Sequence, residues 1–576
     1  MRKLSGYLKN YKLNLTLGPL AKLTEAVFEL IVPLVMSDII DNGIDGDGGV
    51  EYILSHGAIM VALGVLGLCC ALTCQYLAAK CSQGFGTELR NDLFRHINSL
   101  SFKELDKFGT PSIVNRLSAD VNQLQYMVAM LIRLVIRAPF LVIGAAVMAM
   151  TINLKLSLVF IAATPLIAVV LYFIMSRSVP RYKTVQKKLD GVSLVTRENL
   201  SGVRVVRAFA EQEYEKDRFD KAADDLTKNA VVVGRISALL NPATFVIINA
   251  AILAILWFGG GLVYEGEMTQ GEVFAFVNYM TQISLALVVL AQLVVTITKA
   301  LASASRVKEL LETQPSVTDE GNEYVQADDN APAVVFDNVS FGYNDGKYTL
   351  KGLSVAIPKG ASVGVIGGTG SGKSTLVNLL GRFYDVSEGS VSLFGTDVRK
   401  YPLKQLRSLV AYVPQNTMLF AGTVRSNLQM GGRNADDETL WRCLETAQAA
   451  QFVREKPDGL DSEVVQGGRN FSGGQRQRLA VARALAAEPS ILVLDDSSSA
   501  LDFATDYAMR KAINETKGDA TLFIVSQRAT SIKDCDVVIV LDEGSVEGIG
   551  KHDDLLKTCD VYREIYYSQT DGGTKE

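Results

Sequence analysis

Residues 470–496 read NFSGGQRQRLAVARALAAEPSILVLDD, and this stretch decides the fold of the second half of the chain. The four apolar residues Ile491–Leu494 predict a short buried strand that ends at Asp495. Residues 472–475 begin a predicted helix that precedes this strand. We therefore expect a soluble α/β domain in which Asp495 stands at the end of a strand.

A glycine-rich loop lies upstream, where residues 361–375 read ASVGVIGGTGSGKST. This is the pattern of a P-loop: its glycines let backbone N–H groups close around phosphate, Lys373 reaches the terminal phosphates, and the Ser374 hydroxyl ligates Mg²⁺. A coincidental glycine-rich turn is disfavoured, because an apolar strand precedes the loop and a helical stretch follows it. The predicted nucleotide-binding residues are Gly367, Gly368, Thr369, Gly370, Ser371, Gly372, Lys373, Ser374 and Thr375.

Length and composition divide the chain in two. A chain of 576 residues is too long for one hydrophobic core. Long apolar runs dominate the first part, and short β-type runs alternate with polar helices in the second. The net charge of -5 gives no basic face of the kind that nucleic acid binding requires, so nucleic acid is not expected as a partner. The predicted domains are residues 1–311 in the membrane, a linker at 312–333, a nucleotide-binding domain at 334–568 and a polar tail at 569–576.

Six segments of the first part are expected to cross a membrane, since a spanning helix needs about 20 mainly apolar residues. They lie near residues 14–41, 52–81, 127–150, 154–176, 236–264 and 271–300. Lys and Arg are absent from the connections 43–50, 151–153 and 265–270 and numerous in 83–126 and 177–235. The positive-inside rule therefore places both long connections, both termini and the second domain in the cytoplasm.

Charged residues inside two of these spans are costly and need an explanation. Lys22, Glu25 and Glu29 share one face of the first span, and Arg133 and Arg137 share one face of the third. Either the arginines pair with Glu25 and Glu29 across the helices, or these groups contact a substrate. Both interpretations stay open.

The whole chain resembles ABC exporter half-transporters. The resemblance rests on the P-loop, on the ordered motifs VSFGY, VAYVPQ, FSGGQ, ILVLDD and SSSALD, and on the cytoplasmic segments FKELDKFGTPSIVNRLSADVNQLQ and ENLSGVRVVRAFAEQEYE. It implies six transmembrane helices with long cytoplasmic extensions, followed by an α/β P-loop ABC ATPase domain that takes ATP and Mg²⁺. In this family two such domains close on two ATP molecules, and the tips of the cytoplasmic loops transmit their motion.

The resemblance also assigns roles to individual residues. Tyr343 stacks on adenine, Gln415 is the Q-loop glutamine, and Asp502 belongs to the D-loop. The implied Mg²⁺ ligands are Ser374, Gln415 and Asp495, the last through water. The signature residues that contact the partner's ATP are Ser472, Gly473, Gly474 and Gln475. They begin a helix whose N-terminus favours an anion.

Two positions depart from the family pattern. Asp496 stands where active members carry the glutamate that polarises water, and its carboxylate reaches about 1.5 Å less far. A general base must lie within about 2.6–3.2 Å of its proton and contributes about 10²–10⁴ in rate, so this shortfall removes most of the effect. Gln527, in IVSQRATSI, replaces the switch histidine. The pattern predicts a site that binds ATP and hydrolyses it slowly.

The favoured function is therefore the degenerate-site subunit of a heterodimeric, bacterial multidrug-type ABC exporter in the cytoplasmic membrane. Its partner would be a second half-transporter with an intact Walker B glutamate and switch histidine. The complex would use ATP hydrolysis to move amphipathic small molecules out of the cytoplasm, through the lipid bilayer, by alternating access. The alternatives are a homodimeric exporter with slow hydrolysis and a nucleotide-gated membrane regulator that does not pump.

Overall fold

The computed structural model describes residues 2–319, 324–326, 328, 330–343, 346–497 and 500–570. The chain forms two compact units, Met1–Asn98 with Thr110–Thr313, and Ser99–Gly109 with Gln314–Glu576. Parts of the predicted linker (residues 320–323, 327 and 329) and of the predicted tail (571–576) lie outside the described residues.

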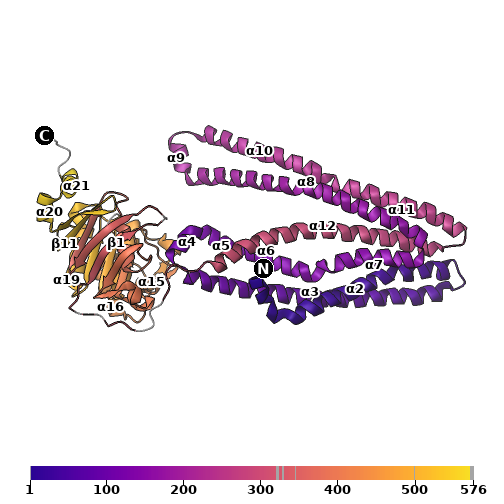
Figure 1. Ribbon diagram of the computed structural model, residues 1–576, viewed down its shortest axis with the longest axis horizontal. Coiled ribbons are helices and arrows are strands. Elements are labelled where there is room, and N and C mark those ends of the chain that lie inside the picture. The colour runs from indigo at the N-terminus through magenta and orange to yellow at the C-terminus, as the bar shows by residue number, and fades with distance from the viewer. Residues whose placement is uncertain are drawn as a thin grey trace. The chain divides into compact units, whose positions relative to one another are not determined.

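The first unit is helical (Figure 1). Its elements are α1 (Arg2–Ser5), η1 (Gly6–Tyr11), α2 (Lys12–Asp38), η2 (Ile39–Ile44), α3 (Gly49–Ser99), α5 (Thr110–Asn115), η3 (Arg116–Asp120), α6 (Val121–Met130), η4 (Leu131–Val135), α7 (Arg137–Ile152), α8 (Leu154–Ser201), α9 (Val203–Ala208), α10 (Gln212–Ala238), α11 (Leu240–Tyr264) and α12 (Gln270–Glu312). The segments η2, η3 and η4 are π-helical. The short α9 joins α8 and α10, which lie side by side in Figure 1.

Five helical runs of the described chain are long and apolar enough to cross a membrane. They are Gly49–Ser99, Thr110–Ile152, Leu154–Ser201, Gln212–Tyr264 and Gln270–Glu312, and they contain the second to sixth predicted spans. The first predicted span coincides with α2 and the start of η2, but Lys22, Glu25 and Glu29 make it too charged to meet the same criterion. Its place in the membrane therefore remains a prediction.

The core of the first unit joins helices that are distant in sequence. Phe160 of α8 and Phe276 of α12 are buried, with ring centroids 5.5 Å apart. Tyr279 of α12 is fully buried, and its hydroxyl donates a 2.8 Å hydrogen bond to the carbonyl of Leu30 in α2. A capping box of Thr269 and Glu272 begins α12. The helix is thus anchored at its N-terminus and in its interior.

The second unit is an α/β domain with a six-stranded sheet in the order β12 (Ser545–Gly550), β11 (Val537–Asp542), β3 (Ser362–Gly367), β10 (Thr521–Val525), β9 (Ile491–Asp495) and β6 (Val410–Val413). All neighbours pair in parallel except β12, which is antiparallel to β11. Every residue of β3, β9 and β10 is buried. Continuous apolar runs suit such central strands, since helices cover both faces of a parallel sheet.

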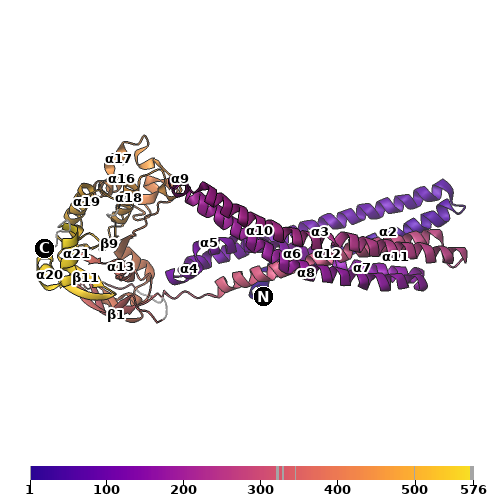
Figure 2. The same ribbon diagram turned by 90° about the horizontal axis from the view of Figure 1, so that it is seen from above.

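Two smaller sheets and short helices complete this unit. The small sheets are β2 (Leu350–Ile357), β1 (Val334–Phe341), β4 (Glu388–Leu393) and β5 (Thr396–Asp397), and β7 (Gly422–Thr423) with β8 (Glu463–Val464). The helices are α4 (Phe102–Phe108), α13 (Lys373–Leu380), η5 (Val398–Lys400), α14 (Leu403–Leu409), α15 (Val424–Leu428), α16 (Asp437–Thr446), α17 (Ala450–Arg454), η6 (Gly459–Asp461), η7 (Gln466–Gly468), α18 (Gly473–Leu485), α19 (Phe503–Thr516), η8 (Ala529–Ser531), α20 (His552–Thr558) and α21 (Asp560–Thr570). Helices α13 and α18 pack against β9 (Figure 2).

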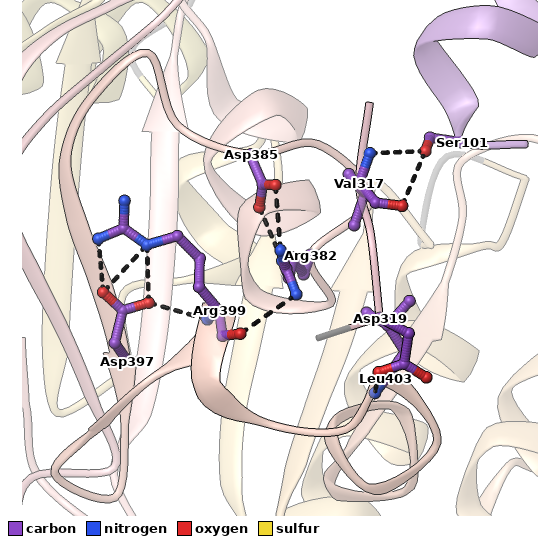
Figure 3. A network of polar contacts seen from close by, with 8 residues as sticks. All are labelled: Ser101, Val317, Asp319, Arg382, Asp385, Asp397, Arg399 and Leu403. Carbon is purple, nitrogen blue, oxygen red and sulfur yellow. Dashed lines mark hydrogen bonds and ion pairs between the residues drawn. The ribbon is translucent and has the colours of Figure 1, made fainter. Parts of the chain in front are cut away.

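The segment Ser99–Gly109 differs from its sequence-based assignment to the membrane domain, because it clusters with the second unit. Phe102 of α4 contacts Phe383, with ring centroids 4.9 Å apart, and the hydroxyl of Tyr384 donates a 2.7 Å hydrogen bond to Asp106. Figure 3 shows the hydroxyl of Ser101 bonded to the backbone of Val317, which follows α12.

A second set of polar contacts holds the neighbouring loops of this unit, also drawn in Figure 3. Asp319 accepts a hydrogen bond from the backbone N–H of Leu403, at the start of α14. The buried Arg382 forms an ion pair with Asp385, and its guanidinium also donates to the carbonyl of Arg399. These contacts hold Ser99–Gly109 and the chain after Gln314 within the second unit.

Candidate nucleotide-binding site

Three parallel strands end at one edge of the central sheet and bring the predicted motifs together. In the register of the sheet, Val525 of β10 is opposite Asp495 of β9 on one side and Val365 of β3 on the other. The glycine-rich loop follows β3, Asp496 follows β9, and Ser526 and Gln527 follow β10. The carboxyl ends of parallel strands are the usual place for a ligand in such a sheet.

The glycine-rich loop takes a conformation that needs glycine at two positions. Gly370 and Gly372 have φ of 83° and 99°, in the region that residues with a side chain rarely adopt. Gly372 is also the N-cap of α13, so the loop leads directly into the N-terminus of that helix. A helix N-terminus and its free N–H groups favour an anion.

Lys373 points back into this loop. Its Nζ donates to the carbonyls of Gly367 at 2.9 Å and Gly368 at 2.7 Å. Burial lowers the pKa of the Lys373 amine, whereas Asp496 and Asp495 act in the opposite sense. The hydroxyl of Ser371 is buried and has no hydrogen-bond partner within the described chain. An orphaned donor in a loop of this shape fits a phosphate group, which supplies acceptor oxygens.

Ser374 and Asp495, two of the predicted Mg²⁺ ligands, are in direct contact. The Ser374 hydroxyl donates to Oδ1 of Asp495 at 3.0 Å, and the Tyr412 hydroxyl donates to Oδ2 at 2.6 Å. Asp495 is 3% exposed. Hydroxyl and carboxylate oxygens are the hard ligands that Mg²⁺ prefers, so these residues fit that ion.

Gln415 and Asp496 face each other beside this pair. Nε2 of Gln415 donates to Oδ2 of Asp496 at 3.0 Å. Asp496 has φ of 46°, and its backbone is held by the carbonyl of Val525 and by the side chain of Gln477. Burial raises the pKa of the Asp496 carboxyl and Asp495 adds to the rise, although Gln415, Lys373 and Arg528 oppose it. The carboxyl is therefore fixed in place and harder to ionise than an exposed aspartate.

Gln527 lies in an exposed loop at the same edge, and α21 holds the backbone of this loop. Nε2 of Gln569 donates to the carbonyl of Gln527 at 2.8 Å, and Oε1 of Gln569 accepts from the N–H of Ala529 at 2.8 Å. One side chain of the last described helix thus fixes both sides of the loop that carries the predicted switch position.

These residues surround one cavity of about 330 Å³. Its lining includes eleven of the predicted site residues, namely Tyr343, Thr369, Gly370, Gly372, Lys373, Ser374, Thr375, Gln415, Asp495, Asp496 and Gln527. The ring of Tyr343 stands at one side, where its hydroxyl is 3.1 Å from that of Thr375 and its edge meets Tyr384. A partly exposed aromatic ring above a phosphate-type loop can stack on a flat base.

The remaining predicted residues lie outside the lining of this cavity. Ser472 is the N-cap of α18 and forms a capping box with Gln475, so Gly473 and Gly474 occupy the first turn of that helix. Asp502 caps α19 by accepting from the N–H of Thr505 at 3.1 Å. Hydrogen bonds from Thr505 lower the pKa of the Asp502 carboxyl. Within one chain, Ser472 and Asp502 are helix caps, and the other signature residues form the first turn of α18.

Tyr412 and Gln569 belong to the site but carry no signal of this role in the sequence. Tyr412 lies inside the motif VAYVPQ, but a tyrosine in an apolar strand is no signal of a polar contact with Asp495, which is 83 positions away. Gln569 lies at the border of the predicted polar tail. Only the tertiary fold brings these residues to the site.

The fold and the site define a P-loop ATPase domain joined to a helical membrane unit, and comparisons with known proteins specify the family. The family of ABC transporter transmembrane regions matches residues 15–287, and a second family, described as ABC transporter, matches residues 350–499. An uncharacterized ABC transporter ATP-binding protein of Mycobacterium tuberculosis is 36% identical over 568 residues, which cover 98% of this chain and 97% of that protein.

Two further matches have a named activity or a solved structure. A protein of Desulfotalea psychrophila named as an ATP-dependent lipid A-core flippase is 30% identical over 562 residues, covering 97% of each chain. The structure of a bacterial Atm1-family ABC exporter with ATP bound superposes with a TM-score of 0.78 and 25% identity, over 100% of this chain and 99% of that one.

The chain therefore belongs to the ABC transporter family, as an exporter half-transporter with a transmembrane region followed by an ABC ATPase domain. It is a multi-pass membrane protein of a family that couples ATP, bound with Mg²⁺, to transport.

Proposed function

We propose that this chain is the degenerate-site subunit of a heterodimeric exporter in the cytoplasmic membrane. In this proposal its own P-loop site binds ATP and Mg²⁺ but hydrolyses slowly, and its signature residues complete a competent site on a partner half-transporter. The observation that carries the proposal is the pair of altered positions, Asp496 and Gln527, at the edge of one cavity that otherwise keeps its nucleotide-binding residues.

The geometry of Asp496 supports slow hydrolysis. Its carboxylate is one C–C bond, about 1.5 Å, shorter in reach than a glutamate. The side chain also accepts from Gln415, and its backbone is bonded to Val525, so the carboxylate is not free to advance. Burial raises its pKa, so this carboxyl gives up its proton less readily than an exposed aspartate does. A general base contributes a factor of about 10²–10⁴, and one that reaches its proton poorly loses most of this factor, so that only slow hydrolysis is left.

Binding of ATP, in contrast, needs none of the altered groups. The P-loop backbone and Lys373 are arranged for phosphates, Ser374, Gln415 and Asp495 for Mg²⁺, and Tyr343 for the base. When bound, Mg²⁺ shields the phosphate charges and polarises the terminal phosphoryl group. The chain's residues hold ATP in place, whereas the groups that act on water and on the γ-phosphate are deficient.

Two copies of this chain would build two deficient sites, so the proposal requires a different partner. The capped N-terminus of α18 presents free N–H groups of Gly473 and Gly474, which suit a phosphate of the partner's ATP. The substrate is proposed to be an amphipathic, lipid-like small molecule. The relative named as a lipid A-core flippase supports this class, since a lipid is an amphiphile.

The partner's catalytic glutamate gives the decisive test. The intact complex is purified, its mass establishes whether it contains a second kind of half-transporter, and that partner's Walker B glutamate is changed to glutamine. ATP turnover should fall by about 10²-fold or more, because the remaining site is the slow one. Substantial remaining turnover, or a mass that fits two copies of this chain, contradicts the proposal. ATP-dependent dye movement in vesicles separates a pump from a regulator that does not transport.

A further inference from the structure

The membrane charge cluster consists of five charged side chains in the first and third predicted spans, namely Lys22, Glu25, Glu29, Arg133 and Arg137. Two ion pairs account for four of them. Lys22 Nζ lies 2.5 Å from Oε2 of Glu25 within α2. Arg137 Nη2 of α7 lies 2.6 Å from Oε2 of Glu29 in α2. Of the two interpretations left open, pairing across helices is present for Arg137 and Glu29, whereas Glu25 pairs with Lys22 in its own helix.

Arg133 is the fifth member, and it has no ion pair or hydrogen bond among the residues that the structure describes. Three positive and two negative groups leave the cluster with one positive charge. A charge in the hydrocarbon region is costly, and such residues usually pair with another charge or mark a substrate path. The excess charge of Arg133 thus calls for an anion.

The backbone around Arg133 is also irregular. Arg133 lies in the π-helical segment η4, inside the third predicted span. Single π-helical turns within α-helices are frequent at functional sites, because the extra residue redirects side chains. The segment η4 packs against α2 and α12, and Arg133, Lys22 and Glu25 lie near the buried Cys74 of α3.

Unused hydrogen-bonding groups lie beside the ion pairs. Nε of Arg137 is buried and has no partner in the described chain, and the same is true of Oε1 of Gln282 in α12. Nε2 of Gln282 donates to the carbonyl of Glu29, so this glutamine belongs to the cluster. Buried polar groups of this kind are uncommon and indicate a missing polar partner.

We infer that Arg133 is the centre of a binding site for the anionic head group, a phosphate or carboxylate, of an amphiphilic molecule. An arginine donates several charge-assisted hydrogen bonds in a geometry that matches both anions. The flanking apolar helices would take the hydrocarbon part. This inference rests on the proposed export function and names the class of substrate; a bilayer lipid with an anionic head group offers the same chemistry.

Binding of two probes with the same tail tests the site without ATP. The intact transporter is placed in nanodiscs of phosphatidylcholine, and the affinities of dodecyl phosphate and dodecylphosphocholine are compared. We expect dodecyl phosphate to bind about tenfold more tightly, a difference that Arg133→Gln removes and Arg133→Lys largely keeps. Lys155→Gln, which alters an exposed cation paired with Glu267, is the matched control and should leave both affinities unchanged.

The variant Arg133→Gln breaks no ion pair within the described chain, so its melting temperature and ATP affinity should stay near those of the unchanged protein. If it does not fold, the comparison of the two probes on the unchanged protein and on Arg133→Lys still decides the question. Nanodiscs that contain phosphatidylglycerol show where the anionic head group comes from. Weaker probe binding in these nanodiscs supports an anionic bilayer lipid as the occupant of the site. Unchanged probe binding supports an exported amphiphile. Equal affinity for the two probes, or an unchanged preference in Arg133→Gln, overturns the inference while leaving ATP-driven transport intact.

Discussion

The hydroxyl of Tyr412 lies 2.6 Å from Oδ2 of Asp495, and the ring of Tyr412 meets Phe383 edge-on with centroids 5.5 Å apart. Phe383 in turn contacts Phe102 of α4. The carboxylate proposed to hold Mg²⁺ is therefore oriented by a tyrosine that belongs to an aromatic chain reaching α4. Tyr412 binds Oδ2, whereas the hydroxyl of Ser374 donates to Oδ1. Oδ1 therefore faces the P-loop.

Tyr412→Phe should weaken Mg²⁺-dependent ATP binding. The change removes the donor to Oδ2 of a buried carboxylate and keeps the ring and its packing. A lost hydrogen bond to a charged group costs about 1.5 kcal/mol or more, so we expect the affinity for ATP with Mg²⁺ to fall about tenfold. Fluorescent ATP analogues, titrated with Mg²⁺ and then with EDTA, measure this effect. A loss of equal size in both conditions would indicate general damage to the site instead of a lost orientation of Asp495.

The P-loop and the strand that ends at Asp495 could be predicted because their residue types act locally. Glycines at 370 and 372 set the loop conformation, and Ile491–Leu494 can only be a buried strand next to such a loop. The contact of Tyr412 with Asp495 could not be predicted in this way, because parallel pairing of β6 with β9 determines it. The local sequence pattern therefore predicts the motif, whereas the pairing of the strands determines which residue contacts Asp495.

The helices of the first unit were predictable from hydropathy for the same local reason, but the membrane charge cluster was predictable only in part. Spacing placed Lys22, Glu25 and Glu29 on one face, yet it could not distinguish a pair within α2 from a pair between helices. The π-helical turn at Leu131–Val135 changes the direction of Arg133 relative to Arg137 and has no sequence signal of its own. Likewise, α4 joined the second unit because Phe102 and Asp106 find partners there.

Restoring the two altered positions should restore hydrolysis at this site. Asp496→Glu lengthens the carboxylate by about 1.5 Å, and Gln527→His supplies the missing switch side chain. With the partner's catalytic glutamate changed to glutamine, we expect turnover to rise about 10-fold to 100-fold over the same complex without the restoration. Vanadate trapping of a photoreactive nucleotide reports which chain is labelled. Unchanged turnover and labelling would show that these positions do not limit hydrolysis.

On acidification, the rate of hydrolysis at this site should begin to fall at a higher pH than an ordinary aspartate would give. Burial, aided by Asp495, raises the pKa of Asp496, and only the ionised carboxylate can accept a proton. Activity should therefore fall as the pH drops through a value above the ordinary aspartate pKa of about 4. The native state binds this proton more tightly than the unfolded chain does. Protonation of Asp496 therefore stabilises the fold at low pH, and this contribution is lost as the pH rises through the raised pKa.

This prediction is checked by measuring ATP turnover over a pH series, in a complex whose partner site is inactive. The same series on Asp496→Asn is the comparison. The asparagine variant should lose both the residual activity and the pH dependence of melting that this carboxyl contributes. If activity falls only near the ordinary aspartate pKa, burial does not raise the pKa of Asp496.

Tyr384→Phe should weaken the link between α4 and the nucleotide site. The Tyr384 hydroxyl donates to Asp106 of α4 at 2.7 Å, and its ring contacts Tyr343 with centroids 5.2 Å apart. The variant keeps the ring, so ATP affinity should change little, whereas the stimulation of ATPase activity by a transported compound should fall severalfold. Tyr348→Phe is the matched control, because Tyr348 donates a similar 2.8 Å bond to Glu388 away from α4. Equal effects of the two variants would assign the loss to general stability.

Gln569→Ala should release the loop of Gln527 from α21. Its side chain donates to the carbonyl of Gln527 and accepts from the N–H of Ala529, and the loss of these bonds costs about 1 kcal/mol. In the unchanged chain, whose switch position is a glutamine, we expect no change in turnover. In the chain with Asp496→Glu and Gln527→His, a histidine on a loosened loop should lose much of the regained hydrolysis. Gln451→Ala removes a comparable exposed bond, to Glu455, and serves as control. If both glutamine variants act alike, α21 does not position the switch loop.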